Sequence, residues 1–132
     1  MVRIEASYDG NLRCTATHMP SGNQLITDAP IDNKGKGESF SPTDLLATSM
    51  LTCIMTIVAI RADSKGIDVR GMSGSVEKTM AANPRRVAKL EVVVNLPDGL
   101  NLDDRSWLIT EGCNCPVCVS VSESMEVDVT FE

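Results

Sequence analysis

The sequence predicts an α+β fold in which an antiparallel sheet surrounds one long, buried central helix. Three observations lead to this prediction. An uncharged run from residue 45 to 60 lies between a clear helix start and a clear helix stop. Segments in which apolar and polar residues alternate, the pattern of half-buried strands, precede and follow this run. Strands and helices do not alternate regularly, which favours antiparallel pairing over a parallel βαβ sheet.

Length, charge and cysteine content limit the classes of function. The 132 residues fit a single domain spanning 1–132. A net charge of −6 argues against nucleic acid and anionic membrane surfaces as partners, because both would repel the protein. The N-terminus carries Arg3 and Glu5 and no apolar run, so no secretory signal is expected. Five cysteines, an odd number, fit a reducing cytoplasm better than a disulfide framework.

The first forty residues are predicted to form three short strands and a loop. Apolar and polar residues alternate over residues 2–8 and again over 12–16, and the Asp9-Gly10 pair between them is a typical hairpin turn. Residues 24–27 are a third candidate strand. Residues 28–40 carry turn formers and charges without periodicity, so they are expected to form a loop that leads into the helix, as a lid beside a buried cysteine would.

The central helix has clear signals at both ends. Ser41 is placed to cap it, Pro42 suits the first helical position, and Asp44 stands where a capping box has its acid. Lys65, expected as a cation over the last helix carbonyls, and Gly66 form the stop. Apolar residues occupy every face between, so the helix must be buried all round, and its length favours a core helix over a membrane span. A chain of this size has little material with which to surround the helix alone, so we expect a second copy to cover part of it.

The second half of the chain is predicted to add three strands and two helices. Residues 67–78 and 86–96 are expected to pair as strands. Residues 103–111 are expected to form a helix with Trp107 and Leu108 on its inner side. Pro116 opens a short helix over 116–122, and residues 125–131 alternate as a strand with one wet face.

Cys53, in the middle of the central helix, is the first candidate for chemistry. It lies on an apolar stripe, where a free cysteine commonly packs as a small hydrophobe, so burial alone explains it. Cys53 is about three turns from the helix start, too far for the helix dipole to help. A reactive thiolate at this position would therefore need a neighbouring cation.

Cys115, just before Pro116, is the second candidate. Unpaired backbone N–H groups at a helix start favour a thiolate there. The Cys115-Pro116-Val117-Cys118 quartet resembles the redox turn of glutaredoxins, although that turn follows an N-terminal strand. Cys113, Cys115 and Cys118, together with Cys14 or His18, are alternatively a ligand set for zinc or an iron–sulfur centre.

Two motifs together resemble the OsmC/Ohr family over nearly the whole chain. They are the run Ser41-Pro42-Thr43-Asp44-Leu45-Leu46 leading to Cys53, and Cys115-Pro116-Val117 ahead of a closing strand. Family members are α+β proteins that form intertwined homodimers, with two central helices packed together and active sites at the subunit interface. The better-studied members are thiol peroxidases that act on organic hydroperoxides.

The resemblance assigns roles to two cysteines. Cys53 would be the peroxidatic nucleophile and become a sulfenic acid, and Cys115 would resolve it as a disulfide. A thiol reductant or dithiol protein would reopen the disulfide, and no cofactor is implied. An apolar pocket would favour alkyl or lipid-like hydroperoxides, since burial of a carbon tail contributes roughly 0.8 kcal/mol per methylene.

The sequence also departs from the family pattern. The organic-hydroperoxide branch activates its thiolate with an Arg held by a Glu ten residues before the cysteine, where this chain has Thr43. Asp44 and Arg13 are candidate stand-ins, and the chain is closer to the broad OsmC-like branch. Two other functions remain open: a metal-binding protein that uses Cys113, Cys115 and Cys118, and a non-catalytic dimer that binds a small apolar molecule.

Overall fold

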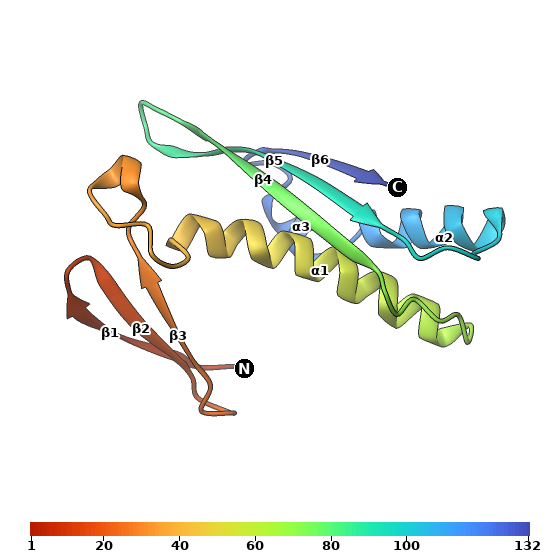
Figure 1. Cartoon of the computed structure of the whole chain (residues 1–132), viewed down its shortest axis with the longest axis horizontal. Coiled ribbons are helices and arrows are strands. Elements are labelled where there is room, and N and C mark those ends of the chain that lie inside the picture. The colour runs from red at the N-terminus through yellow and green to blue at the C-terminus, as the bar shows by residue number, and fades with distance from the viewer. The chain divides into compact units, whose positions relative to one another are not determined.

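The computed structural model describes all 132 residues, which divide into two compact units, residues 1–46 and 47–132. Figure 1 shows the elements in chain order. They are β1 (Ile4–Gly10), β2 (Arg13–His18), β3 (Gln24–Asp28), a 3₁₀ turn (Ile31–Asn33), α1 (Pro42–Ser64), β4 (Ser73–Ala81), β5 (Arg86–Asn95), α2 (Leu102–Cys113), α3 (Pro116–Val121) and β6 (Glu126–Phe131). The mixed α+β class predicted from the sequence is confirmed.

The first unit holds an antiparallel sheet in the order β1-β2-β3. The three predicted strands are present, but the hairpin turn lies further along the chain than expected. Asn11 and Leu12, not Asp9-Gly10, occupy its two central positions, with φ values of 54° and 63°. A two-residue hairpin needs positive φ at both positions, and an irregularity between Tyr8 and Gly10 shifts the register to provide it.

One face of this sheet is apolar and open to solvent. Ala6 pairs with Ala16, which pairs with Leu25, so these positions and their alternate neighbours Ile4 and Tyr8 share a face. Ile4 and Tyr8 are each 66% exposed and Leu25 is 43% exposed. A three-stranded sheet needs a covered apolar face for stability. In a single chain, this apolar face of the sheet is therefore exposed, although its burial would stabilise the unit.

The predicted start and stop of α1 are both present. The Ser41 side-chain oxygen accepts from the Asp44 backbone N–H at 3.1 Å, and the Asp44 carboxylate accepts from the Ser41 N–H at 2.8 Å, a complete capping box. After the helix, Gly66 takes a φ of 67° and the Ile67 N–H bonds back to the Ala62 carbonyl at 2.9 Å.

α1 is buried along one stripe, not all round as the sequence predicts. The buried positions recur at helical spacing: Ala47, Met50, Ile54, Val58 and Ala62. Thr52, Thr56 and Ile60 line an exposed stripe, and Ile60 is 57% exposed. The difference has a physical reason, since one sheet and one helix can cover only part of a cylinder. α1 is long and apolar enough to cross a membrane, with a mean hydropathy of 1.9, but core helices meet the same criterion.

The second unit contains a sheet in the order β4-β5-β6. β4 and β5 pair antiparallel, but β5 and β6 pair parallel, so the expectation of a wholly antiparallel sheet is wrong for this pair. The chain passes through α2 and α3 between β5 and β6, and such a crossover returns it in the same direction. The outer face is polar, as predicted for β6: Lys89 forms ion pairs there with Glu91, Glu126 and Asp128.

The strand predicted over 67–78 begins later, at Ser73. Gly71 has a φ of 92°, which breaks the extended run, and Ile67 and Val69 pack on the core as part of a loop. Gly74 then lets α1 approach the sheet, because a Cβ there would lie 2.8 Å from the Leu51 side chain. The absence of a side chain at Gly74 therefore allows β4 to lie against the central helix.

α2 packs on α1 through a core that includes Leu108, Val58 and Ala62, each fully buried. The predicted inner side of α2 is thus confirmed for Leu108, and Trp107 is packed beside it under the ammonium group of Lys65, 3.6 Å from the ring centre. The ammonium group of Lys65 therefore lies over the Trp107 ring and not over the last carbonyls of α1. This packing carries the end of α2, and the cysteines that follow it, to the side of α1.

Candidate functional site: a cluster of sulfur atoms on the central helix

Cys115 is the N-cap of α3, as the sequence predicts. Its side chain accepts a hydrogen bond from the Cys118 backbone N–H at 3.3 Å, and Pro116 occupies the first helical position. Asn114, the C-cap of α2, separates the two helices. Cys115 is fully buried, whereas Cys113 at the end of α2 is exposed.

Cys118 brings two further sulfur contacts to this point. Its Sγ lies 2.9 Å from the Sγ of Cys115, which donates to it, and the Cys118 thiol in turn donates to the Sδ of Met50 at 3.1 Å. Met50 belongs to the buried stripe of α1, one turn before Cys53. The Cys-x-x-Cys segment is therefore fixed directly against the central helix.

Cys53 completes the cluster. It is half-buried on α1, and the Cys115 side chain and the Val117 backbone N–H lie close enough to it to shift its pKa. The structure therefore brings together Cys53 and Cys115, the two residues to which the family resemblance assigns roles. The sequence offers a signal for the third member, Cys118, in its Cys-x-x-Cys spacing, but none for the contact with Met50.

Burial raises the pKa of the Cys53 thiol above its ordinary value. The Val117 N–H lowers this pKa, and the hydrogen bond and charge of Cys115 raise it further. None of these influences is a cation. The pKa of Cys118 is raised more strongly, to about 12, first by burial and then by Cys115. In this arrangement Cys53 is a protonated thiol at neutral pH.

We expect the alkylation of Cys53 by iodoacetamide to accelerate roughly tenfold per pH unit between about pH 7 and pH 9. The thiolate is the reacting form, and below the pKa its fraction rises with that slope. The measurement is the mass of tryptic peptide 37–61, in which Cys53 is the sole cysteine, in samples quenched over time. A rate already level at pH 7 would contradict the expectation and would show that a cation acts on the thiol.

The two candidate activators of Cys53 have other partners within the first unit. Asp44 serves the capping box of α1. Arg13 forms ion pairs with Asp28, at 3.3 Å, and with Glu38. The N–H of Glu38 and the guanidinium of Arg13 hold the pKa of Asp28 below its usual range. Arg13 is thus part of a local network that ties β2 to the loop after β3.

The three C-terminal cysteines do not form a metal centre in this structure. No group of three or more His, Cys, Asp or Glu side chains has an arrangement that could hold a metal ion. Two of the sulfur atoms lie 2.9 Å apart, in direct contact, while Cys113 points to solvent. In the first unit, His18 is exposed and bonds to Ser21 at 2.6 Å, and Cys14 is half-buried on β2.

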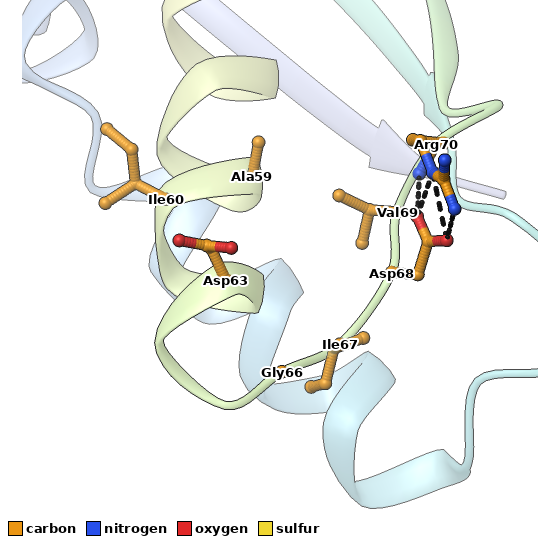
Figure 2. A pocket seen from close by; sticks show the side chains of 8 residues that line it. All are labelled: Ala59, Ile60, Asp63, Gly66, Ile67, Asp68, Val69 and Arg70. Carbon is orange, nitrogen blue, oxygen red and sulfur yellow. Dashed lines mark hydrogen bonds and ion pairs between the residues drawn. The ribbon is translucent and has the colours of Figure 1, made fainter.

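A hollow of about 600 Å³ lies further along α1, at its C-terminal end. Figure 2 shows Ile60 and Asp63 on the helix side and the loop from Gly66 on the other. Asp68 and Arg70, at its edge, pair with each other at 2.6 Å. None of its lining residues is a cysteine, so this hollow is separate from the sulfur cluster.

Comparison with known proteins gives one family match and several structural matches. The family model described as OsmC-like protein matches residues 35–130. No curated protein matches the sequence. A solved protein from Psychrobacter arcticus 273-4, described as osmotic stress induced and as a detoxification response protein, is 40% identical with a TM-score of 0.94, over 100% of this chain and 96% of that one.

Two more distant structures share the fold. The organic hydroperoxide resistance protein OsmC from Legionella pneumophila is 17% identical with a TM-score of 0.80, over 100% of this chain and 96% of its own. The organic hydroperoxide resistance protein OhrB of Bacillus subtilis is 16% identical with a TM-score of 0.72, over 100% and 98%. At these identities the likeness concerns the fold alone.

Proposed function

The chain belongs to the OsmC-like family, and from this premise we propose that it is a cysteine-dependent peroxidase that reduces organic hydroperoxides in oxidative-stress defence. One observation carries the proposal: Cys53 on the central helix lies beside Cys115, which comes from a distant part of the chain. Burial as a small hydrophobe explains either cysteine alone. It does not explain why two free thiols meet.

Formation of the disulfide requires only these two side chains and the substrate. The Cys53 thiolate attacks the terminal oxygen of the hydroperoxide, which breaks the O–O bond, yields the alcohol and leaves Cys53 as a sulfenic acid. The Cys115 thiol then attacks the Cys53 sulfur, and water leaves as the disulfide forms. A thiol reductant or a dithiol protein returns both cysteines to thiols. Free thiols persist between turnovers in a reducing, cytoplasmic setting.

An apolar substrate fits the surroundings of Cys53. The apolar side chains of Leu51 and Ile57, close to Cys53 on α1, are only partly buried. An alkyl or lipid-like tail placed against such residues gains roughly 0.8 kcal/mol per methylene removed from water. Hydrogen peroxide has no such tail, so we infer a preference for organic hydroperoxides.

A homodimer is part of the proposal. The apolar face of β1, β2 and β3 is open, and 28% of the most apolar stretch of α1 is buried within one chain. Surfaces of this kind are stable in water when another protein surface covers them. A second copy is the partner we propose, and light scattering should give a mass of about twice the 14.2 kDa of one chain.

The decisive experiment is the intact mass of the reduced protein after one equivalent of cumene hydroperoxide. We expect the wild type to lose two hydrogens, since both thiols enter a disulfide. Cys115→Ser should instead gain one oxygen or more, because its sulfenic acid has no resolving partner. If Cys53 stays an unmodified thiol in both proteins, the peroxidase proposal fails.

A further inference from the structure

Cys118 takes no part in the two-cysteine cycle, yet its sulfur is in direct contact with that of Cys115. The Sγ atoms are 2.9 Å apart, and the backbone N–H of Cys118 also bonds to the Cys115 sulfur, at 3.3 Å. Both residues are buried. The Cys-x-x-Cys spacing places them on the first turn of α3, so the contact is built into the local backbone.

We propose that Cys118 is a second resolving cysteine that moves the disulfide from Cys53–Cys115 to Cys115–Cys118. This inference rests on the proposed function, which supplies the first disulfide. In the step, the Cys118 sulfur attacks the Cys115 sulfur, the bond between Cys53 and Cys115 breaks, and Cys53 leaves as a thiol. One disulfide is consumed and one is formed, so no further oxidant or reductant is needed.

Geometry favours Cys118 as the attacking group. The Cys118 sulfur is already in contact with the Cys115 sulfur that it would attack. Because the reaction is intramolecular, folding has already met the entropic cost of bringing the two groups together. The Cys118 thiol donates a hydrogen bond to the Sδ of Met50 at 3.1 Å, on the side of α1. This contact holds Cys118 between Cys115 and the helix that carries Cys53.

Cys118 must lose its thiol proton in this step, and the departing Cys53 sulfur can take one up. In the reduced protein the pKa of Cys118 is about 12, because of burial and then of the hydrogen bond and charge of Cys115. In the Cys53–Cys115 disulfide, Cys115 has neither proton nor charge, so these two influences on the pKa of Cys118 disappear, while burial and the charge of Cys113 remain. Burial also raises the pKa of Cys53, so the departing sulfur takes up a proton readily.

The exchange has a consequence for the site. Cys115 and Cys118 are buried, whereas Cys53 is half-buried. The oxidised protein therefore holds its disulfide in the interior and presents Cys53 as a thiol, before any external reductant acts. Cys113 is not a candidate for this role, because it is exposed and its sulfur has no hydrogen bond to that of Cys115 in the structure. The variant Cys113→Ser is therefore a matched control in the same segment.

Peptide mapping distinguishes the two disulfides, because trypsin separates them. Peptide 37–61 contains Cys53 alone, and peptide 106–132 contains Cys113, Cys115 and Cys118. The reduced full-length protein receives one equivalent of cumene hydroperoxide, is trapped with N-ethylmaleimide at mildly acidic pH over a time course, and is digested without reduction. A Cys53–Cys115 bond gives two cross-linked peptides. A Cys115–Cys118 bond gives a loop within peptide 106–132.

We expect the wild type to convert to the loop form, with N-ethylmaleimide on Cys53 and Cys113 and roughly tenfold less cross-linked than looped product. Cys118→Ser and Cys118→Ala should both stop at the cross-linked form, and Cys113→Ser should behave as wild type. Circular dichroism spectra like that of the wild type show that the variants fold, and the cross-link itself shows that Cys53 and Cys115 still meet.

Three outcomes would overturn the relay. A wild type that stays cross-linked throughout would exclude it and leave the peroxidase proposal intact. A loop that also forms in Cys53→Ser would show that peroxide oxidises the Cys-x-x-Cys pair directly. An unmodified Cys53 with neither product would refute the peroxidase proposal and the relay with it.

Discussion

Cys53→Ser should abolish hydroperoxide consumption. The serine hydroxyl stays protonated at any working pH and is far less nucleophilic than a thiolate, so the O–O bond finds no attacking group. Loss of the nucleophile in other enzymes lowers the rate by several orders of magnitude, and we expect a decrease on the order of a thousandfold or more here. Serine is nearly isosteric with cysteine, so the fold should remain.

The measurement is the rate of cumene hydroperoxide loss with dithiothreitol as reductant. Cys14→Ser is the matched control, since Cys14 is also half-buried and free but lies on β2 in the first unit, outside the sulfur cluster. Its activity should stay near that of the wild type. If the wild type and Cys53→Ser consume hydroperoxide at the same rate, and no faster than dithiothreitol alone, the result would favour a non-catalytic dimer that binds a small apolar molecule.

The sequence predicts the elements well where local chemistry decides them. Ser41 and Asp44 specify a capping box that depends on four consecutive residues, and Gly66 specifies a helix stop; both are observed. The Asp9-Gly10 turn is misplaced by two residues because the register of the flanking strands, a matter of pairing, overrides the preference of the turn residues.

Predictions that depend on long-range contacts are less successful. The parallel pairing of β6 with β5 follows from the route of the chain through α2 and α3, and nothing in the alternating pattern of β6 distinguishes it from an antiparallel strand. The charges around Lys89 illustrate the same point, since its three carboxylate partners lie on two strands. Their proximity depends on that pairing.

The candidate site combines features that local sequence predicts with features that depend on long-range contacts. Cys115 at the start of α3 is predicted locally, from the proline that follows it. Its approach to Cys53 is predicted from a family resemblance and not from spacing, because the two residues are far apart in the chain. The contact between Cys118 and Met50 appears only in the structure, where the close packing of α2 on α1 at Gly112 brings α3 against the helix.

Leu108→Ala should cause the largest loss of stability among single truncations in α2. The Leu108 side chain is fully buried against Val58 and Ala62 of α1, so the variant loses its burial and leaves a cavity between the two helices. Truncation of a buried leucine typically costs about 2–5 kcal/mol of the free energy of unfolding. Urea unfolding followed by circular dichroism, at one fixed protein concentration, measures this difference.

Leu102→Ala offers a control in the same helix with the same chemical change. Leu102 is 81% exposed, so its truncation should change the free energy of unfolding by less than about 0.5 kcal/mol. Equal and small effects at both positions would refute the packing of α2 on α1. A large loss at both would mean that Leu102 is covered in the assembled protein, which places a second copy over the start of α2. The pair of variants therefore tests the core of one chain and the extent of the proposed dimer interface in a single experiment.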